Sequence, residues 1–249
     1  MTTTSRPLDG AVCLVTGGGR GIGRASALAM ARAGAAVAVA ARTTAQLADV
    51  VQEIRGEGGT ALAVKADITS RDECRAMVER TVAELGRLDV LLCNAGGGLT
   101  GGKLVDSDPE AWAGTVVLNL TGVFHCCQAA IPVMARQGAG KVLLMGSGAG
   151  HAATPGMSAY AAAKAGASQL VRVLAQEVWQ DGIDVNEIVP GPVATELTSP
   201  HFTLGESLRG ARSERVKAPD EVAELVLWLA TRPHGGPTGQ TFSLARRPL

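Results

Sequence analysis

Short apolar runs rich in valine and leucine alternate along this chain with longer amphipathic stretches. This alternation predicts β-α units and a parallel sheet, because each parallel strand is reached through a helical crossover and is covered on both faces. The expected strands are Ala11–Thr16, Ala36–Ala41, Thr60–Lys65, Leu88–Cys93, Gly140–Gly146, Ile183–Val189 and Gln240–Leu244. The expected helices are Arg20–Ala33, Thr44–Gly56, Arg71–Leu85, Pro109–Gln137, Met157–Gln180 and Pro219–Thr231, with a kink or boundary at Pro132. No repeat or long linker interrupts the pattern, so residues 1–249 are expected to form a single α/β domain, a doubly wound parallel sheet of about seven strands with helices on both faces.

The composition excludes several classes of protein. With 46% apolar and 18% charged residues, a chain of 249 residues can bury a sizeable core. Basic and acidic residues balance at 23 each, so no nucleic-acid partner is expected. No uninterrupted apolar run reaches about 18 residues and the first ten residues lack an apolar stretch, so we expect neither a membrane span nor a secretory signal. Five scattered cysteines without C-x-x-C spacing and four histidines without ligand spacing indicate a cytoplasmic protein with reduced thiols and no metal site.

A glycine-rich turn joins the first expected strand to the first expected helix. Its sequence, residues 16–23, places glycines at 17, 18, 19, 21 and 23. Glycines allow a tight turn and let the backbone approach a pyrophosphate at the N-terminus of a helix. The spacing G-x-x-x-G-x-G differs from G-x-G-x-x-G, and no Gly-Lys-Ser/Thr follows, which excludes a P-loop. The turn therefore predicts dinucleotide binding; a purely structural turn is the alternative.

Two arginines near this turn indicate which dinucleotide is bound. Proteins that bind NAD usually carry an acid about 20 residues beyond the glycines, where it bonds the ribose 2′-hydroxyl. Here Arg42 follows the second strand, and the first acid after Gly23 is Asp49. A guanidinium pairs with phosphate oxygens, so Arg42 and Arg20 predict a 2′-phosphate and hence NADP(H). The alternative is that both are ordinary surface arginines.

The only tyrosine of the chain, Tyr160, lies four residues before Lys164 in an expected helix, which places both on one face. A free tyrosine has a pKa of about 10, and a neighbouring ammonium favours its phenolate form. Ser147 follows an apolar strand, where its hydroxyl can donate to a carbonyl oxygen that gains negative charge. A hydrolase elbow of the form Gly-x-Ser-x-Gly is excluded, because Met145 occupies the first glycine position.

From about Ala11 to Ser243 the chain resembles the short-chain dehydrogenase/reductase family, and in particular its members similar to 3-oxoacyl-carrier-protein reductases. The motifs that carry the resemblance are Thr16-Gly17-x-x-x-Gly21-Ile22-Gly23, Asn94-Ala95-Gly96, Asn119, Ser147, Tyr160-x-x-x-Lys164 and Pro190-Gly191. The resemblance implies a Rossmann-type fold. It also implies that Tyr160 is the acid/base, that Lys164 assists it and bonds the nicotinamide ribose, that Ser147 polarises the carbonyl and that Asn119 holds a water in a proton relay.

The glycine-rich turn and the two arginines, together with this resemblance, give the residues expected to bind the cofactor. They are Gly17, Gly19, Arg20, Gly21, Ile22, Gly23, Arg42, Asp67, Ile68, Asn94, Ala95, Gly96, Tyr160, Lys164, Pro190, Gly191, Val193 and Thr195. Asp67 matches a position that contacts adenine, and Pro190-Gly191 matches the segment that grips the nicotinamide carboxamide.

The function expected from these features is an NADP(H)-dependent oxidoreductase that moves hydride between nicotinamide and a ketone/secondary alcohol pair. The alternatives are an NAD-dependent alcohol dehydrogenase and a catalytically idle NADP(H)-binding sensor. The expected partners are a small-molecule carbonyl or alcohol substrate and further copies of the chain in a tetramer or dimer, with no nucleic acid and no membrane.

Three further expectations concern the surroundings of the site. The irregular segment 193–218 follows the carboxyl end of a strand and is either a mobile substrate loop or a simple surface loop. The substrate pocket is expected to include Gly97, Gly98, Ala149, His151, Leu197 and Phe202. Glu187, where the family normally has a small or apolar residue, is expected to point outward.

Overall fold

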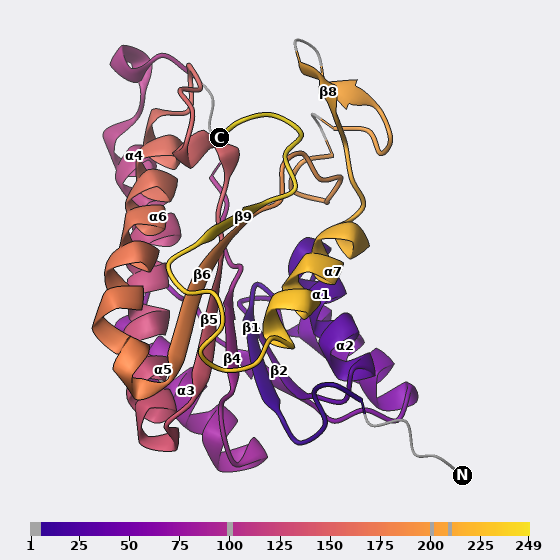
Figure 1. The fold of residues 1–249 in the computed structure, drawn as a ribbon. Coiled ribbons are helices and arrows are strands. Elements are labelled where there is room, and N and C mark those ends of the chain that lie inside the picture. Colours follow the sequence, from indigo (N-terminus) through magenta and orange to yellow (C-terminus); the bar gives the residue numbers. More distant parts are fainter. Residues whose placement is uncertain (1–5, 99–101, 200–201, 209–210) are drawn as a thin grey trace.

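A computed structural model describes residues 6–98, 102–199, 202–208 and 211–249, and Figure 1 shows the sheet at its centre. Seven parallel strands lie in the order β3-β2-β1-β4-β5-β6-β9. Their bounds are β1 Val12–Thr16, β2 Ala36–Ala41, β3 Ala61–Lys65, β4 Val90–Cys93, β5 Gly140–Met145, β6 Ile183–Val189 and β9 Thr241–Ser243. The predicted fold class is confirmed, and the strand bounds agree to within two residues.

Helices cover both faces of this sheet (Figure 1). On one face lie α1 Gly21–Arg32, α2 Thr44–Gly56 and α7 Pro219–Ala230. On the other lie α3 Arg71–Leu85, α5 Gly122–Gln137 and α6 Ser158–Val178, with α4 Pro109–Val116 packed against α6. Short helical turns occur at η1 Leu104–Asp106, η3 Gly148–Gly150 and η4 Trp179–Asp181.

Neighbouring strand residues enter different cores, because successive side chains point to opposite faces of a sheet. Cys13 and Val15 of β1 belong to the core under α1, α2 and α7, whereas Leu14 belongs to the core under α3, α5 and α6. The central strands β1, β4, β5 and β6 are buried along their whole length. All five cysteines are buried free thiols, and burial raises the pKa of Cys13 far above its ordinary value.

The predicted helix Pro109–Gln137 is divided by a π-helical segment, η2 Val117–Thr121, between α4 and α5. Pro132 lies inside α5 and does not end it, so the prediction that a helix boundary could fall at Pro132 is wrong. The stretch 109–137 is long and apolar enough to cross a membrane by length and composition alone. Its buried residues in α5 include positions 123, 126, 127, 130 and 134, a stripe typical of a helix packed on a sheet.

Segment 193–218, predicted to be irregular, contains two short strands. β7 Ser207–Leu208 and β8 Ala211–Arg215 pair antiparallel, apart from the main sheet. β8 continues toward α7, and the main chain of Lys217 bonds Pro192 and Ala194 in the segment that follows β6. The two strands therefore project from the end of the sheet at which the parallel strands finish (Figure 1).

Candidate active site

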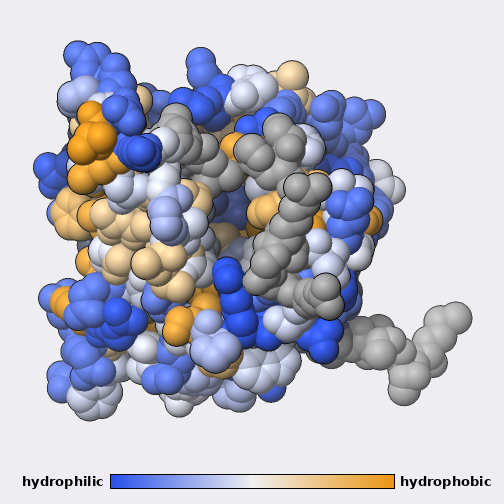
Figure 2. All heavy atoms as spheres, turned by 90° about the horizontal axis from the view of Figure 1, so that it is seen from above, coloured by the Kyte–Doolittle hydropathy of each residue, from blue (hydrophilic) through white to orange (hydrophobic). Residues whose placement is uncertain are grey.

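A cleft of about 510 Å³ lies at the carboxyl ends of the strands. In an open α/β sheet, ligands bind outside the carboxyl ends of the strands, at the point where the strand order reverses. The reversal falls between β1 and β4 here, because β2 and β3 extend the sheet to one side of β1 and β4 to β9 extend it to the other. Figure 2 views this end of the molecule from above and shows a hollow near its middle. The cleft volume falls in the range of about 300–1,000 Å³ that is usual for small-molecule sites.

The glycine-rich turn forms one wall of the cleft and leads into α1. Gly17 has φ +64°, and a Cβ there would lie 2.9 Å from the Cα of Ala95; a Cβ on Gly23 would lie 2.2 Å from the Gly17 carbonyl oxygen. Glycine is therefore required for the turn to approach β4 and for α1 to pack beneath it. Arg20, the N-cap of α1, makes no side-chain capping bond, and the first turn holds no acid. The N–H groups at this helix end are thus available to an anion.

Thr16 and Asn94 join the ends of β1 and β4 beside that turn. The Thr16 Oγ1 donates to the Leu92 carbonyl (3.2 Å) and accepts from the N–H groups of Asn94 (3.0 Å) and Ala95 (3.1 Å). The Asn94 Nδ2 donates to the carbonyls of Thr16 (3.0 Å) and Gly17 (3.2 Å). These bonds fix the glycine-rich turn against β4, so this part of the cleft is held in shape by contacts within the protein.

The predicted phosphate-binding arginines stand at the same end of the cleft. Arg20 and Arg42 both line it, and the side chain of Arg42 is 73% exposed. The nearest carboxylate oxygen to Arg42 is Oδ2 of Asp67, at 3.9 Å from Nη1, which is longer than a hydrogen bond. A hydrogen bond from the Thr69 main-chain N–H, together with the Thr69 hydroxyl and Arg42, lowers the pKa of Asp67. Asp67 therefore carries its negative charge beside Arg42 at neutral pH.

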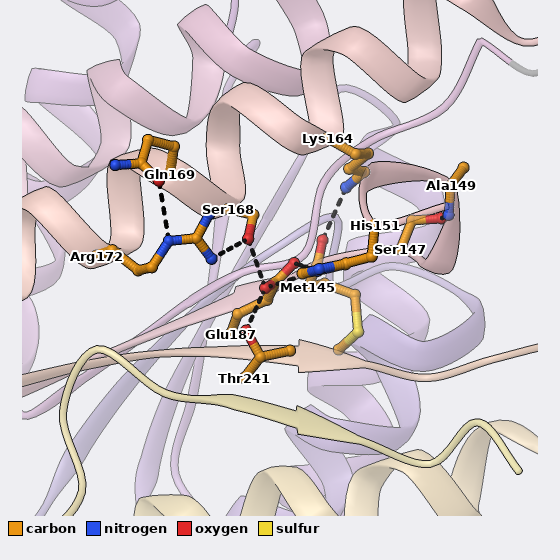
Figure 3. A network of polar contacts seen from close by, with 10 residues as sticks. All are labelled: Met145, Ser147, Ala149, His151, Lys164, Ser168, Gln169, Arg172, Glu187 and Thr241. Atoms are coloured by element: carbon orange, nitrogen blue, oxygen red, sulfur yellow. Dashed lines mark hydrogen bonds and ion pairs between the residues drawn. The ribbon is translucent and has the colours of Figure 1, made fainter. Parts of the chain in front are cut away.

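At the other end of the cleft, β5 and α6 bring Ser147, Tyr160 and Lys164 together. Lys164 is buried, and its Nζ donates to the Met145 carbonyl oxygen at the end of β5 over 2.7 Å (Figure 3). The same ammonium lies 5.7 Å from the centre of the Tyr160 ring, one helical turn away. The Ser147 Oγ accepts from the Ala149 N–H at 3.2 Å and keeps its own proton for another partner.

Asn119, on the π-helical segment, is fully buried and does not line the cleft. Its Nδ2 donates to the carbonyls of Gly97 (2.7 Å) and Thr115 (2.9 Å), and its Oδ1 accepts from the Gly97 N–H (3.2 Å). Both side-chain donors are used in this way, so the side chain holds the strand-end segment 94–97 in place. Among the described residues, Oδ1 accepts this one hydrogen bond, which leaves its second lone pair unused.

Nearly all of the expected site residues face this one cleft. All of the expected cofactor and catalytic residues line it except Gly23 and Asn119. Of the residues expected in the substrate pocket, Gly97, Ala149, Leu197 and Phe202 line the cleft, whereas Gly98 and His151 do not. The expectation that Glu187 points outward is wrong, because Glu187 is buried with 1% of its surface exposed and accepts hydrogen bonds from His151. The structure adds lining residues that the sequence did not indicate, among them Thr43, Gln46, Leu118, Thr154, Met157, Glu214, Ala245 and Arg247.

The C-terminal segment reaches the cleft through Glu214 of β8. Glu214 is buried, and its Oε1 accepts from the Arg246 main-chain N–H (3.1 Å) and lies 3.4 Å from Arg247 Nε. The Lys217 Nζ lies 4.0 Å from Glu214 Oε2, and burial lowers the pKa of Lys217. Glu214 and Lys217 are three residues apart, whereas Arg246 is 32 residues from Glu214, so no local motif predicted that these charges meet at the cleft.

The parallel sheet, its strand order and the cleft at the point of reversal define a Rossmann-type α/β protein. Residues 11–203 match the short chain dehydrogenase family. A 3-oxoacyl-[acyl-carrier-protein] reductase of Synechocystis sp. is 38% identical over 240 residues, covering 95% of this chain and 96% of that protein. The 7alpha-hydroxysteroid dehydrogenase of Escherichia coli K12 is 34% identical over 241 residues, covering 96% and 94%.

Solved structures of dehydrogenases share this fold. A short-chain type dehydrogenase/reductase from Mycobacterium marinum is 35% identical and superposes with a TM-score of 0.86, covering 95% of this chain and 94% of that one. A 7 alpha-hydroxysteroid dehydrogenase complexed with NADH and 7-oxo glycochenodeoxycholic acid is 32% identical and superposes with a TM-score of 0.87, covering 98% and 96%. The chain belongs to the short-chain dehydrogenase/reductase family of oxidoreductases.

Proposed function

We propose that the chain is an NADP(H)-dependent oxidoreductase that interconverts a ketone and a secondary alcohol, with Tyr160 as the acid/base. The observation that carries this proposal is the shared cleft: a glycine-rich turn open to an anion at one end, and a phenol, an ammonium and a serine hydroxyl at the other. A cleft that only bound the nucleotide would need the first set and not the second. The second set therefore favours an enzyme over an idle sensor.

The residues present fit a nicotinamide dinucleotide. The uncapped N-terminus of α1 and the close approach of Gly17 suit the pyrophosphate, and Pro190, Gly191, Val193 and Thr195 line the same cleft. When bound, the cofactor supplies or accepts the hydride. Asn94, Ala95 and Gly96 follow β4, which lies between β1 and β6 in the sheet, and they line the cleft as well.

The chain's own groups handle the oxygen and its proton. In reduction, Ser147 donates a hydrogen bond to the carbonyl oxygen, and the Tyr160 hydroxyl gives that oxygen its proton as negative charge develops. Lys164 lies beside the Tyr160 ring and favours the phenolate that this transfer leaves. Its own position is fixed by the bond to the Met145 carbonyl, while Asn119 keeps the neighbouring segment in place.

NADP(H) rather than NAD(H) is proposed because Arg42 is exposed at the cleft and, among the residues that the structure describes, has no carboxylate oxygen within hydrogen-bond distance. Its guanidinium is free to pair with a 2′-phosphate, and Arg20 lines the same end. An NAD-dependent alcohol dehydrogenase is the second candidate. Asp67, 3.9 Å from Arg42, favours it, because a carboxylate there can accept a hydrogen bond from a ribose hydroxyl.

The similar 3-oxoacyl-[acyl-carrier-protein] reductase and hydroxysteroid dehydrogenase support a carbonyl or alcohol on a larger organic molecule as the substrate. Segment 193–218 contributes Leu197, Phe202 and Glu214 to the cleft, so we assign it to substrate binding. We also propose that the protein acts in the cytoplasm as a tetramer or dimer and engages neither nucleic acid nor membrane. Light scattering of the purified protein tests the oligomeric state.

Replacement of Tyr160 by phenylalanine tests the catalytic assignment. We expect ketone-dependent NADPH oxidation, measured over a panel of ketones, to fall by at least about 100-fold, because a general acid contributes roughly that much. The affinity for NADPH, measured by quenching of tryptophan fluorescence, should stay close to that of the unaltered protein. Turnover that survives the Tyr160→Phe change would show that the acid/base has been assigned wrongly.

A further inference from the structure

A carboxyl group is buried beneath the catalytic end of the cleft. Glu187 lies on β6, is 1% exposed and accepts hydrogen bonds from three side chains (Figure 3). Its Oε2 accepts from His151 Nε2 at 3.0 Å, from Ser168 Oγ at 2.8 Å and from Thr241 Oγ1 at 2.8 Å, and its Oε1 lies 3.1 Å from His151 Nε2. A buried carboxyl without such partners is costly, so each of the three donors is held to it.

The three donors come from three separate parts of the fold. Thr241 is the first residue of β9, at the edge of the sheet. Ser168 lies on α6 one turn beyond Lys164 and also accepts from Arg172 Nη1 at 3.0 Å. His151 ends the short segment that begins at Ser147 and contains η3. Glu187 therefore links β6 and β9 both to the helix of Lys164 and to the segment of Ser147.

The Ser147–His151 segment is short enough for the position of its last residue to constrain its first. Within it, the Gly150 N–H donates to the Ser147 carbonyl at 2.9 Å and the His151 N–H donates to the Gly148 carbonyl at 3.1 Å. These two bonds make it one compact turn. A shift of the His151 ring is therefore transmitted to Ser147.

Glu187 and α6 also confine this segment by direct contact. A Cβ added to Gly146, the residue before Ser147, would lie 2.1 Å from Glu187 Oε1. A Cβ added to Gly150 would lie 2.8 Å from the main-chain carbon of Lys164. The chain on either side of Ser147 thus lies in close contact with the buried carboxyl at Gly146 and with the backbone of α6 at Gly150.

We propose that Glu187 is a positioning residue that acts through His151 to fix the position of the Ser147 hydroxyl relative to the side chains of Tyr160 and Lys164. The proposal rests on the function proposed above, in which Ser147 donates to the carbonyl oxygen. A misplacement of about 1 Å in such a group costs roughly 100-fold in rate. Glu187 and His151 therefore raise the rate of the chemical step without touching the substrate.

The His151→Ala variant removes the link to the Ser147 segment, and Thr241→Val is its matched control. Thr241→Val also removes one hydrogen bond from Glu187 Oε2, but on the side of β9, and leaves the Ser147 segment untouched. We expect His151→Ala to lower kcat by about tenfold to 100-fold, with the NADPH affinity within about twofold of normal. Thr241→Val should keep kcat while losing comparable stability in urea unfolding.

Two further readouts separate positioning from a general loss of structure. With NADPH deuterated at the transferred position, the isotope effect on kcat should increase in His151→Ala, because the chemical step becomes slower. His151→Gln, whose terminal amide N–H can reach the same carboxyl, should regain most of the lost kcat. Equal kcat values for His151→Ala and the unaltered protein would overturn the proposal, as would equal losses in His151→Ala and Thr241→Val. Absence of ketone reduction in the unaltered protein would instead refute the proposed function.

Discussion

Replacing Arg42 with alanine is expected to remove the preference for NADPH. The side chain is 73% exposed and lies 3.9 Å from its nearest carboxylate oxygen, on Asp67, so little is lost within the free protein. A charge-assisted hydrogen bond contributes about 1.5–3 kcal/mol, and its exposure places Arg42 at the lower end of that range. Because about 1.4 kcal/mol corresponds to a factor of ten, kcat/KM for NADPH should fall about 10- to 30-fold.

The same change leaves Asp67 without its neighbouring cation. Because hydrogen bonds from Thr69 keep the pKa of Asp67 below its ordinary value, that carboxylate stays ionised and would repel a 2′-phosphate. NADH carries no such phosphate, so its kcat/KM should change little or improve. The NADPH/NADH ratio of kcat/KM is therefore the quantity to measure, from initial rates at low cofactor concentration.

Arg75→Ala provides the control for this experiment. Arg75 is equally exposed, at 71%, and lies 3.5 Å from Glu79, but it does not line the cleft. Its removal should leave the ratio unchanged. An unchanged ratio in Arg42→Ala as well would refute the assignment of Arg42 to the 2′-phosphate and favour the NAD-dependent alternative.

Two further predictions concern stability. Gly146→Ala should lower the free energy of unfolding by about 1–3 kcal/mol, because the new Cβ would overlap the hydrogen-bonded carboxyl of Glu187; an unchanged urea midpoint would contradict this. Glu221→Gln should lower the free energy of unfolding at neutral pH by about 0.5 kcal/mol, since the Arg215 guanidinium and the Ala218 N–H hold the pKa of Glu221 down to about 2. Because the pKa of Glu221 is lowered in the folded protein, its carboxylate stabilises the fold at pH values above the ordinary pKa of 4.5, and this effect is lost as the pH falls toward 2. The free energies of unfolding of the unaltered protein and Glu221→Gln, measured in urea, should therefore become equal near pH 2. A difference that persists there would refute the ion-pair explanation.

Local patterns predicted the sheet, because each strand is a short apolar run and the glycine-rich turn follows the first of them. They did not predict the strands β7 and β8, which are short and polar, or the π-helical segment at 117–121, which the apolar pattern does not distinguish from an ordinary helix. The residues expected to bind cofactor mostly line one cleft, but their roles stay predictions.

Glu187 shows most clearly why the rest could not be predicted. From the sequence alone, the carboxyl of Glu187 on β6 is expected to face solvent. Its three donors, Ser168, His151 and Thr241, are 19, 36 and 54 residues away along the chain. Only the folded arrangement brings them together, so no spacing in the sequence reveals that this acid can be buried.

The buried thiols have a practical consequence. Cys13 lies in the core under α1, α2 and α7, whereas Cys74, Cys93, Cys126 and Cys127 lie in the core on the opposite side of the sheet. An alkylating reagent can reach either group only when that layer of helices opens. The rate at which each cysteine is labelled, resolved by mass spectrometry, would therefore measure separately how often the helical layer on each face of the sheet opens by local unfolding.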